Sequence, residues 1–173
     1  GGTIAIDSEV DRGTSVYFSI PFSIVDDSEL SSISDDDVFH DLKSLRVLLA
    51  EDDKISRMAV ERQLEMSGSQ VKSVENGSQV LNELQNGEYD LILMDVQMPD
   101  MDGLEATRAI RTGAAGEVNK NIPIIAMTAY AMAGDRERFL DSGMDDYLSK
   151  PLKLETLYDT LERHVSGRHQ MRQ

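Results

Sequence analysis

Three carboxylates lie where predicted strands end. Glu51 and Asp52 directly follow one apolar run, and Asp95 directly follows another. In an open parallel sheet, ligands bind beyond the carboxyl ends of the strands where the strand order reverses, so these acids are expected to converge on one crevice. Clustered carboxylates repel one another unless a cation shares the site, and oxygen ligands of this kind suit Mg²⁺. The alternative interpretation is a set of separate, solvated acids at loop starts.

Two other polar side chains follow predicted strands, Thr128 and Lys150. A fixed ammonium and a hydroxyl that face a Mg²⁺–carboxylate site are what a phosphoryl group needs, because its charge lies on its equatorial oxygens. Asp95 is then the candidate nucleophile of an aspartyl phosphate, since the metal would hold the other two acids. Lys150 alone would be interpreted as a surface lysine, but Pro151 fixes the chain beside it, in a bond that can be cis.

These side chains need a parallel sheet to position them. From residue 45 onward, apolar strands alternate with amphipathic segments, as in a sheet covered by helices on both faces, and we expect the strand order 2-1-3-4-5. The predicted strands are 46–50, 70–74, 90–94, 122–127 and a short one around Tyr147. The predicted helices begin near Lys54, Gly77, Gly103, Ala133 and Leu154. We also expect a left-handed cap at Gly143, a loop over 112–121, and core positions for Met58, Met66, Met94 and Met127.

The first quarter of the chain has a different composition. Residues 3–7 and 15–20 are predicted to form a hairpin that is marginal alone, and the acidic, Ser-rich residues that follow are predicted to be a linker. The formal net charge of −15 argues against nucleic acid and anionic membranes as partners. The chain has no Cys, no apolar run of membrane-spanning length and no secretion signal. We expect the chain as given to be soluble, and its start without Met suggests a piece of a longer protein.

Four sequence runs resemble the receiver domain of two-component response regulators over about residues 45–166; they are residues 47–53, 91–103, 126–129 and 147–151. The resemblance implies an α/β, flavodoxin-like fold, a doubly wound five-stranded parallel sheet flanked by five helices. It implies that Asp95 is the phosphoacceptor, with Mg²⁺ held by Glu51, Asp52, Asp95 and the backbone carbonyl of Gln97. Thr128 and Lys150 would hold the phosphoryl oxygens.

The same resemblance assigns a conformational switch. Thr128 would move toward the phosphoryl group and Tyr147 would turn into the vacated space, which changes an output surface over about 133–165. Gln97 and Tyr130 would tune the phosphate lifetime, and the bulk of Tyr130 implies slow self-hydrolysis. Two departures bear on metal affinity: Glu51 stands where many receivers have Asp, and Asp53 adds a negative charge.

Residues 1–22 resemble the closing strands of a histidine-kinase ATPase domain, so the whole looks like part of a hybrid histidine kinase. The implied boundaries are 1–22 for the truncated ATPase domain, 23–44 for the linker, 45–166 for the receiver and 167–173 for a tail. The family's ATP-binding boxes are absent, so the fragment should only catalyse transfer to its own Asp. The segment 40–44 resembles a phosphoacceptor histidine box, but its position favours the linker interpretation.

The implied partners are the kinase core of the parent, a histidine phosphotransfer protein, or both, with the fragment a monomer or weak dimer. It is expected to be cytoplasmic and to make no membrane contact itself, while upstream segments could anchor the parent. Two alternatives stay open. One is a docking module that works independently of phosphate. The other is a Mg²⁺-dependent phosphohydrolase, although Gln97 stands where such hydrolases usually carry a second Asp.

Overall fold

The chain forms two compact units, Gly1–Asp37 and Val38–Gln173. A computed structural model describes residues 2–9, 12–21, 42, 45–129 and 135–165. The predicted linker and tail, and the histidine box at 40–44 apart from Leu42, lie outside the described residues. No helix in the described ranges has both the length and the apolar character needed to cross a bilayer.

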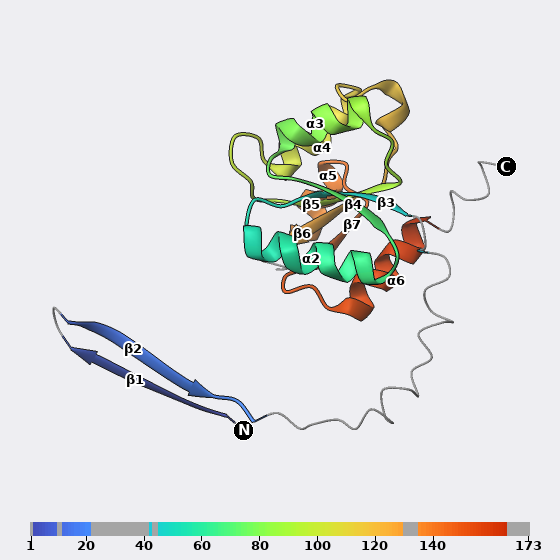
Figure 1. Ribbon diagram of the computed structural model, residues 1–173. Helices are drawn as coiled ribbons and strands as arrows, with labels where there is room; N and C mark the ends of the chain where they lie inside the picture. The colour runs from blue at the N-terminus through green and yellow to red at the C-terminus, as the bar shows by residue number, and fades with distance from the viewer. Residues whose placement is uncertain (1, 10–11, 22–41, 43–44, 130–134, 166–173) are drawn as a thin grey trace, which may run out of the picture. The chain divides into compact units, whose positions relative to one another are not determined.

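The first unit contains an antiparallel hairpin, as the sequence predicts. Strand β1 (Thr3–Glu9) pairs with β2 (Gly13–Ser19), both longer than expected (Figure 1). Ile4 lies opposite Phe18 and Ile6 lies opposite Val16. Because side chains alternate between the two faces of a strand, these four share one face. Each of them is more than half exposed, so the hairpin presents an apolar face.

The second unit is built on a parallel sheet with the strand order β4-β3-β5-β6-β7. In chain order these strands are 2-1-3-4-5, which confirms the predicted topology. Their bounds are β3 Arg46–Ala50, β4 Gln70–Val74, β5 Leu91–Asp95, β6 Ile124–Thr128 and β7 Asp146–Ser149. Every residue of β5 and β6 is buried. Both faces of these central strands are covered, which explains their uninterrupted apolar runs.

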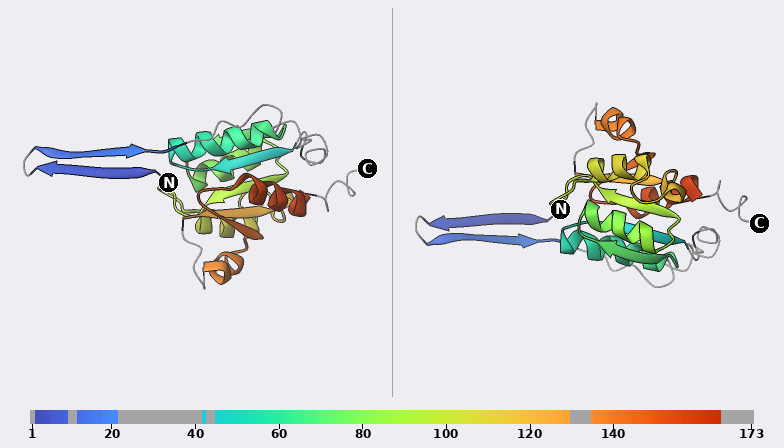
Figure 2. Two further views of the ribbon diagram at one scale, coloured as in Figure 1. Left: turned by 90° about the horizontal axis from the view of Figure 1, so that it is seen from below. Right: turned by 90° about the horizontal axis from the view of Figure 1, so that it is seen from above.

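In the described part of the unit, five helices pack around the sheet. Their bounds are α2 Lys54–Met66, α3 Gly77–Asn86, α4 Gly103–Thr112, α5 Asp135–Asp141 and α6 Leu154–Val165. Helices α3 and α4 lie on one side, and α2 and α6 on the other (Figure 1). Helix α5, in orange, lies at the edge of the domain in both views of Figure 2. The fold is therefore the predicted doubly wound α/β sheet.

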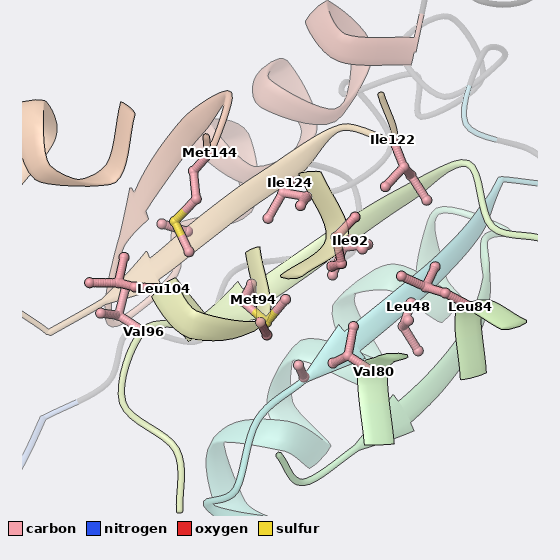
Figure 3. Close-up of a cluster of buried hydrophobic side chains, with 14 of the residues drawn as sticks. Leu48, Val80, Leu84, Ile92, Met94, Val96, Leu104, Ile122, Ile124 and Met144 are labelled. Atoms are coloured by element: carbon pink, nitrogen blue, oxygen red, sulfur yellow. The ribbon is translucent and has the colours of Figure 1, made fainter. Parts of the chain in front are cut away.

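Two apolar clusters hold the layers together. Alternate strand residues such as Leu48, Ile92 and Ile124 face the cluster that includes side chains of α3, α4 and α5 (Figure 3). The intervening residues, such as Leu49 and Leu93, face the cluster that includes side chains of α2 and α6. Because period-two alternation sends successive side chains to opposite faces, the sheet is fixed from both sides and its strand ends are held in register.

Several predicted boundaries differ from the structure. Asp95 and Thr128 are the last residues of β5 and β6 rather than the residues after them. The predicted loop over 112–121 contains a short 3₁₀ helix, η1 (Glu117–Asn119). Helix α5 is described only from Asp135, so its predicted start at 133 lies outside the described residues. Gly143 has a φ of 97°, which confirms the predicted left-handed residue.

The predicted burial of methionines was half right. Met94 and Met127 are fully buried, but Met58 and Met66 are 58% and 64% exposed. The buried residues of α2 include Val60 and Leu64. Each helical residue turns the side-chain direction by about 100°, so a residue two positions away points to the opposite side. The exposed methionines therefore lie on the outer face of α2.

Candidate functional site

The carboxyl ends of neighbouring strands bring the three predicted acids together. Ala50 of β3 lies opposite Met94 of β5, so the residues that follow them meet at one edge of the sheet. Glu51, Asp52 and Asp95 each offer a carboxylate oxygen, and these oxygens lie within 4.8 Å of one another. Glu51 is fully buried, Asp95 is 7% exposed, and Asp52 is exposed. This geometry confirms the predicted convergence of the acids.

Lys150 directly follows β7, which lies two strands from β5, and its ammonium reaches the acid cluster. Its Nζ lies 2.5 Å from Oε2 of Glu51 and donates a 2.7 Å hydrogen bond to Oδ2 of Asp95. Its backbone N–H donates to the carbonyl of Thr128 at 2.7 Å, which ties the end of β7 to the end of β6. The bond to Pro151 is cis. Lys150 is therefore part of the site and not an isolated surface lysine.

The electrostatics of the cluster reflect an excess of negative charge. Burial raises the pKa of Glu51, and the nearby Asp95 charge raises it further, against the opposing effect of Lys150. Burial lowers the pKa of Lys150, but its hydrogen bonds and charge interactions with Asp95 and Glu51 outweigh burial and leave that pKa above its ordinary value. The ammonium thus contacts two of the three carboxylates, Glu51 and Asp95. A cationic ligand would relieve the remaining repulsion.

The donor set fits a hard divalent cation. Three carboxylates of mixed exposure offer the oxygen ligands that Mg²⁺ takes while keeping some of its waters. Oε2 of Glu51 is buried, and the Lys150 ammonium lies 2.5 Å from it. A carboxylate has about four lone-pair sites, so this contact leaves Glu51 able to bind a further ligand.

The acids open into a pocket of about 320 Å³. Gln97, Thr128 and Lys150 line it together with the three acids. The backbone N–H of Gln97 donates to Oδ1 of Asp95 at 3.1 Å, and Thr128 is buried at the end of β6. Both oxygens of the Asp95 carboxylate are therefore positioned, one by a backbone amide and the other by an ammonium.

One predicted residue lies away from the pocket, and another is not described by the structure. Tyr147 is not among the residues lining the pocket; it is half-buried and packs on Phe139 of α5, with ring centroids 6.2 Å apart and planes inclined by 47°. Tyr130 lies outside the described residues. The segment Asp100–Asp102 supplies no ligand to the acid cluster. Asp102 instead caps α4 in a capping box with Glu105, as expected for a polar turn that leads into a helix.

The start of α2 contributes two residues that the sequence analysis missed, Ser56 and Arg57, beside Asp53, whose charge was expected there. Asp53 and Ser56 line the pocket, and Asp53 caps the helix by accepting from the Ser56 N–H. Arg57 donates from Nη1 to the carbonyls of Glu51 and Asp52, at 2.8 and 3.3 Å. The capping pattern from Asp53 was readable in the sequence. The contacts of Arg57 could not be predicted, because a hydrogen bond from a side chain to backbone carbonyls produces no periodic pattern in the sequence.

Comparisons with known proteins agree with this geometry. The family model "Response regulator receiver domain" matches residues 47–162. The receiver domain of sensor histidine kinase PA1611 from Pseudomonas aeruginosa PAO1, solved with magnesium in its active site cleft, is 41% identical with a TM-score of 0.65, covering 71% of this chain and 98% of that one. The receiver domain of Saccharomyces cerevisiae Ssk1, solved with the histidine phosphotransfer protein Ypd1, is 29% identical with a TM-score of 0.65, covering 72% of this chain and 90% of the other.

Longer signalling proteins also match. Sensor protein GacS of Pseudomonas syringae pv. syringae is 47% identical over 107 residues, which cover 62% of this chain and 12% of GacS. Sensor protein EvgS of Escherichia coli (strain K12) is 34% identical over 170 residues, which cover 98% of this chain, hairpin included, and 14% of EvgS. The chain therefore belongs to the response regulator receiver domain family, as a receiver of the kind found in hybrid sensor histidine kinases.

Proposed function

We propose that Asp95 accepts a phosphoryl group from a phosphohistidine and that the phosphorylated domain changes its partner binding. The observation that carries this proposal is the Asp95 carboxylate itself. It lies at the end of a fully buried strand, is fixed by the Gln97 N–H and by Lys150, and opens into the acidic pocket. A fixed carboxylate can attack phosphorus with little loss of conformational freedom.

In the proposed step, a carboxylate oxygen of Asp95 forms a bond to phosphorus as the phosphorus–nitrogen bond of the donor breaks. The electron pair of that bond returns to the imidazole nitrogen. The Thr128 hydroxyl and the Lys150 ammonium hold phosphoryl oxygens. Mg²⁺, held by Glu51, Asp52, Asp95 and the Gln97 carbonyl, would supply positive charge for the phosphoryl oxygens. The acidic excess of the cluster and the magnesium bound by the PA1611 receiver support this assignment.

The switch and lifetime roles belong to the same proposal. Thr128 would approach the phosphoryl group, and Tyr147 would change its packing, which now includes Phe139. Contacts that a phosphoryl group makes better in one packing would shift the population toward that packing. The output surface would lie over about 133–165. Gln97 and Tyr130 would control water access to the phosphoryl group.

The phosphodonor is proposed to be a protein, either a histidine phosphotransfer protein or the kinase core of the parent. The first turn of α2 borders the pocket through Asp53 and Ser56. In the same part of the helix, Ile55 is 80% exposed and Met58 is 58% exposed. Exposed apolar side chains beside a reactive carboxylate favour a protein donor over a small one. The Ssk1 receiver complex with Ypd1 supports this choice.

The remaining parts of the chain are assigned by the same argument. Residues 1–22 are proposed to be the closing strands of a histidine-kinase ATPase domain, 23–44 a linker, 45–166 the receiver and 167–173 a tail. The exposed apolar face of the hairpin supports the first assignment, because such a face normally packs within a larger sheet domain. The histidine kinase activity of the parent is likewise a proposal.

Mass spectrometry tests the central role of Asp95. The full chain is incubated with Mg²⁺ and a small phosphodonor, and the intact mass is compared for wild type, Asp95→Asn and Asp100→Asn. The control removes an exposed carboxylate outside the acid cluster, at a left-handed position (φ 64°) that Asn tolerates. We expect one added phosphoryl group on wild type and on the control, and none on Asp95→Asn.

An unmodified wild type with every donor, or equal modification of Asp95→Asn, would overturn the proposal. Release of inorganic phosphate from many small esters per protein molecule would favour a phosphohydrolase. Partner binding that ignores both phosphorylation and a phosphoryl analogue would favour a docking module.

A further inference from the structure

We propose that Arg57, oriented by Glu75, is a positioning residue that holds the loop carrying Glu51 and Asp52 in its metal-binding shape. The inference rests on the proposed magnesium site and adds a residue that touches neither the metal nor the phosphoryl group. It begins from the path of the Arg57 side chain, which runs from the first turn of α2 back to the end of β3.

The contacts of Arg57 are with the backbone of both acids. Nη1 donates to the carbonyl of Glu51 at 2.8 Å and lies 3.3 Å from the carbonyl of Asp52, which it also reaches as a donor. These residues connect β3 and α2, so their carbonyls lie between the strand and the helix. A planar guanidinium with several donors can hold two neighbouring carbonyls, whereas an ammonium is a single point of charge.

Glu75 fixes the other side of the guanidinium. Its Oε1 lies 2.9 Å from Nη2 of Arg57. Glu75 directly follows β4, and the backbone there is tied to the acidic loop because the N–H of Glu51 donates to the carbonyl of Val74 at 3.0 Å. The loop is thus held by a backbone bond to β4 and by a side-chain bridge to the residue after it.

The loop has a physical reason to need such a clamp. Two consecutive carboxylates, one buried and one exposed, repel each other. In a mobile loop, metal binding would have to overcome both this repulsion and the entropy of ordering the ligands. The Arg57 side chain is only 15% exposed, so its hydrogen bonds are partly shielded from water. Outer groups that orient metal ligands typically change metal affinity by about 10–100-fold.

Electrostatics alone and the proposed clamp predict opposite changes in Mg²⁺ affinity when Arg57 is removed, so the measurement distinguishes them. Arg57 is a cation near a proposed dication site, so its removal should tighten Mg²⁺ binding if long-range electrostatics dominate. If the clamp dominates, removal should weaken Mg²⁺ binding. Arg62 on the same helix offers a matched control. It is 75% exposed, and its nearest ionic partner is Glu65 at 4.0 Å.

The experiment measures Mg²⁺ affinity by titration calorimetry on the full chain, without any phosphodonor, for Arg57→Met, Arg57→Lys and Arg62→Met. We expect Kd to rise about tenfold for Arg57→Met, to rise less for Arg57→Lys, and to stay within about twofold for Arg62→Met. The rate of phosphorylation against Mg²⁺ concentration should show a raised half-saturation and a nearly unchanged plateau. A merely structural role would lower thermal stability and leave the half-saturation unchanged.

Glu75→Gln supplies a second variant that changes an exposed residue and should fold normally. We expect it to weaken Mg²⁺ binding about threefold in wild type and to have no effect in the Arg57→Met background, as a double-mutant cycle requires of an indirect role. An unchanged or tighter Kd for Arg57→Met would overturn the inference while the magnesium site stands. A wild type that binds no Mg²⁺ would overturn the proposed site and this inference together.

Discussion

Replacing Gly103 by Ala should disturb Asp95, the proposed phosphoacceptor, through the backbone of Asp95. Gly103 is the first residue of α4, where exchanging Gly for Ala ordinarily stabilises a helix by up to about 1 kcal/mol. Here a Cβ would lie 2.1 Å from the carbonyl oxygen of Asp95 and 2.9 Å from Cγ of Met94. The first of these atoms is backbone, so it can yield only if the end of β5 moves.

The size of the effect follows from that distance. Restoring an ordinary contact requires a displacement of about 1 Å, and overpacking of this kind costs about 1–3 kcal/mol. We therefore expect Gly103→Ala to lose about 2 kcal/mol, which corresponds to a fall in Tm of about 8 °C for a domain of this size. A misplacement of about 1 Å at a reacting group can slow a reaction on the order of 100-fold. Phosphorylation of Asp95 should slow accordingly.

Thermal unfolding followed by circular dichroism, and the rate of phosphorylation from a small donor, measure the two effects. Gly87→Ala is the control, since the nearest atoms there, at 3.0 and 3.2 Å, belong to the Tyr89 side chain, which can move. We expect its Tm to change by less than about 3 °C. If Gly103→Ala matched this control in both assays, the close approach would be wrong. A lower Tm with an unchanged phosphorylation rate would refute the coupling to Asp95.

Three other predictions concern stability. Burial raises the pKa of Glu51 above its ordinary 4.5, so ionising Glu51 is less favourable in the folded protein than in the unfolded chain. The folded protein is therefore expected to lose stability as pH rises from 4.5 through the raised pKa. Glu51→Gln should be more stable than wild type in urea at neutral pH without Mg²⁺, and the advantage should vanish toward pH 4.5; a less stable variant at neutral pH would contradict this. Burial and the hydrogen bond to Glu83 raise the pKa of Tyr89 to about 12, so its contribution is present below pH 10 and lost as pH rises toward 12. Tyr89→Phe should lose less stability than wild type across that range in circular dichroism, and an identical alkaline profile would count against the assignment. Thr107 is buried and donates from Oγ1 to the Gly103 carbonyl at 2.7 Å, so Thr107→Val should lose about 1 kcal/mol in thermal unfolding while Thr107→Ser loses less; equal losses would argue that the hydrogen bond is unimportant.

The sheet was predictable because each central strand carries its burial in its sequence. The central strand at residues 46–50 was predicted at its observed bounds, and so was the edge strand at 70–74, of which only Val74 is buried. The alternation of strands and helices limits the topology to a few arrangements, and the order 2-1-3-4-5 is among the common ones. The ends of β5 and β6 were each predicted one residue too early, because a polar residue after the apolar run still pairs with the neighbouring strand. Asp95 lies opposite Met127, and Thr128 lies opposite Ser149.

The composition of the site was predictable, but its distances were not. The strand order places Glu51 and Asp95 on neighbouring strands, which the sequence could imply. The approach of Lys150 to both acids depends on the register of β7, which lies two strands from β5, and on the path of its side chain. A short strand of four residues gives little sequence signal for its register.

What escaped prediction shares one physical property. The contacts of Arg57 with carbonyls, the outward phase of Met58 and the packing of Tyr147 on Phe139 all depend on side-chain direction rather than on residue type. Hydrophobic periodicity reports which face of a helix is buried only when the stripe is wide. In α2 the buried residues are just Val60 and Leu64, so the sequence carries little information on which face of the helix is buried.

The backbone link between Thr128 and Lys150 constrains how the proposed switch can work. The carbonyl of Thr128 accepts the Lys150 N–H at 2.7 Å, so the two residues proposed to bind the phosphoryl group share one hydrogen bond. If Thr128 moves toward a phosphoryl group, this bond either breaks or carries the end of β7 along. Tyr147 is on β7 and packs on Phe139 of α5, so a moving β7 would change that contact directly. Movement of Thr128 and repacking of Tyr147 are then parts of one displacement rather than two separate events.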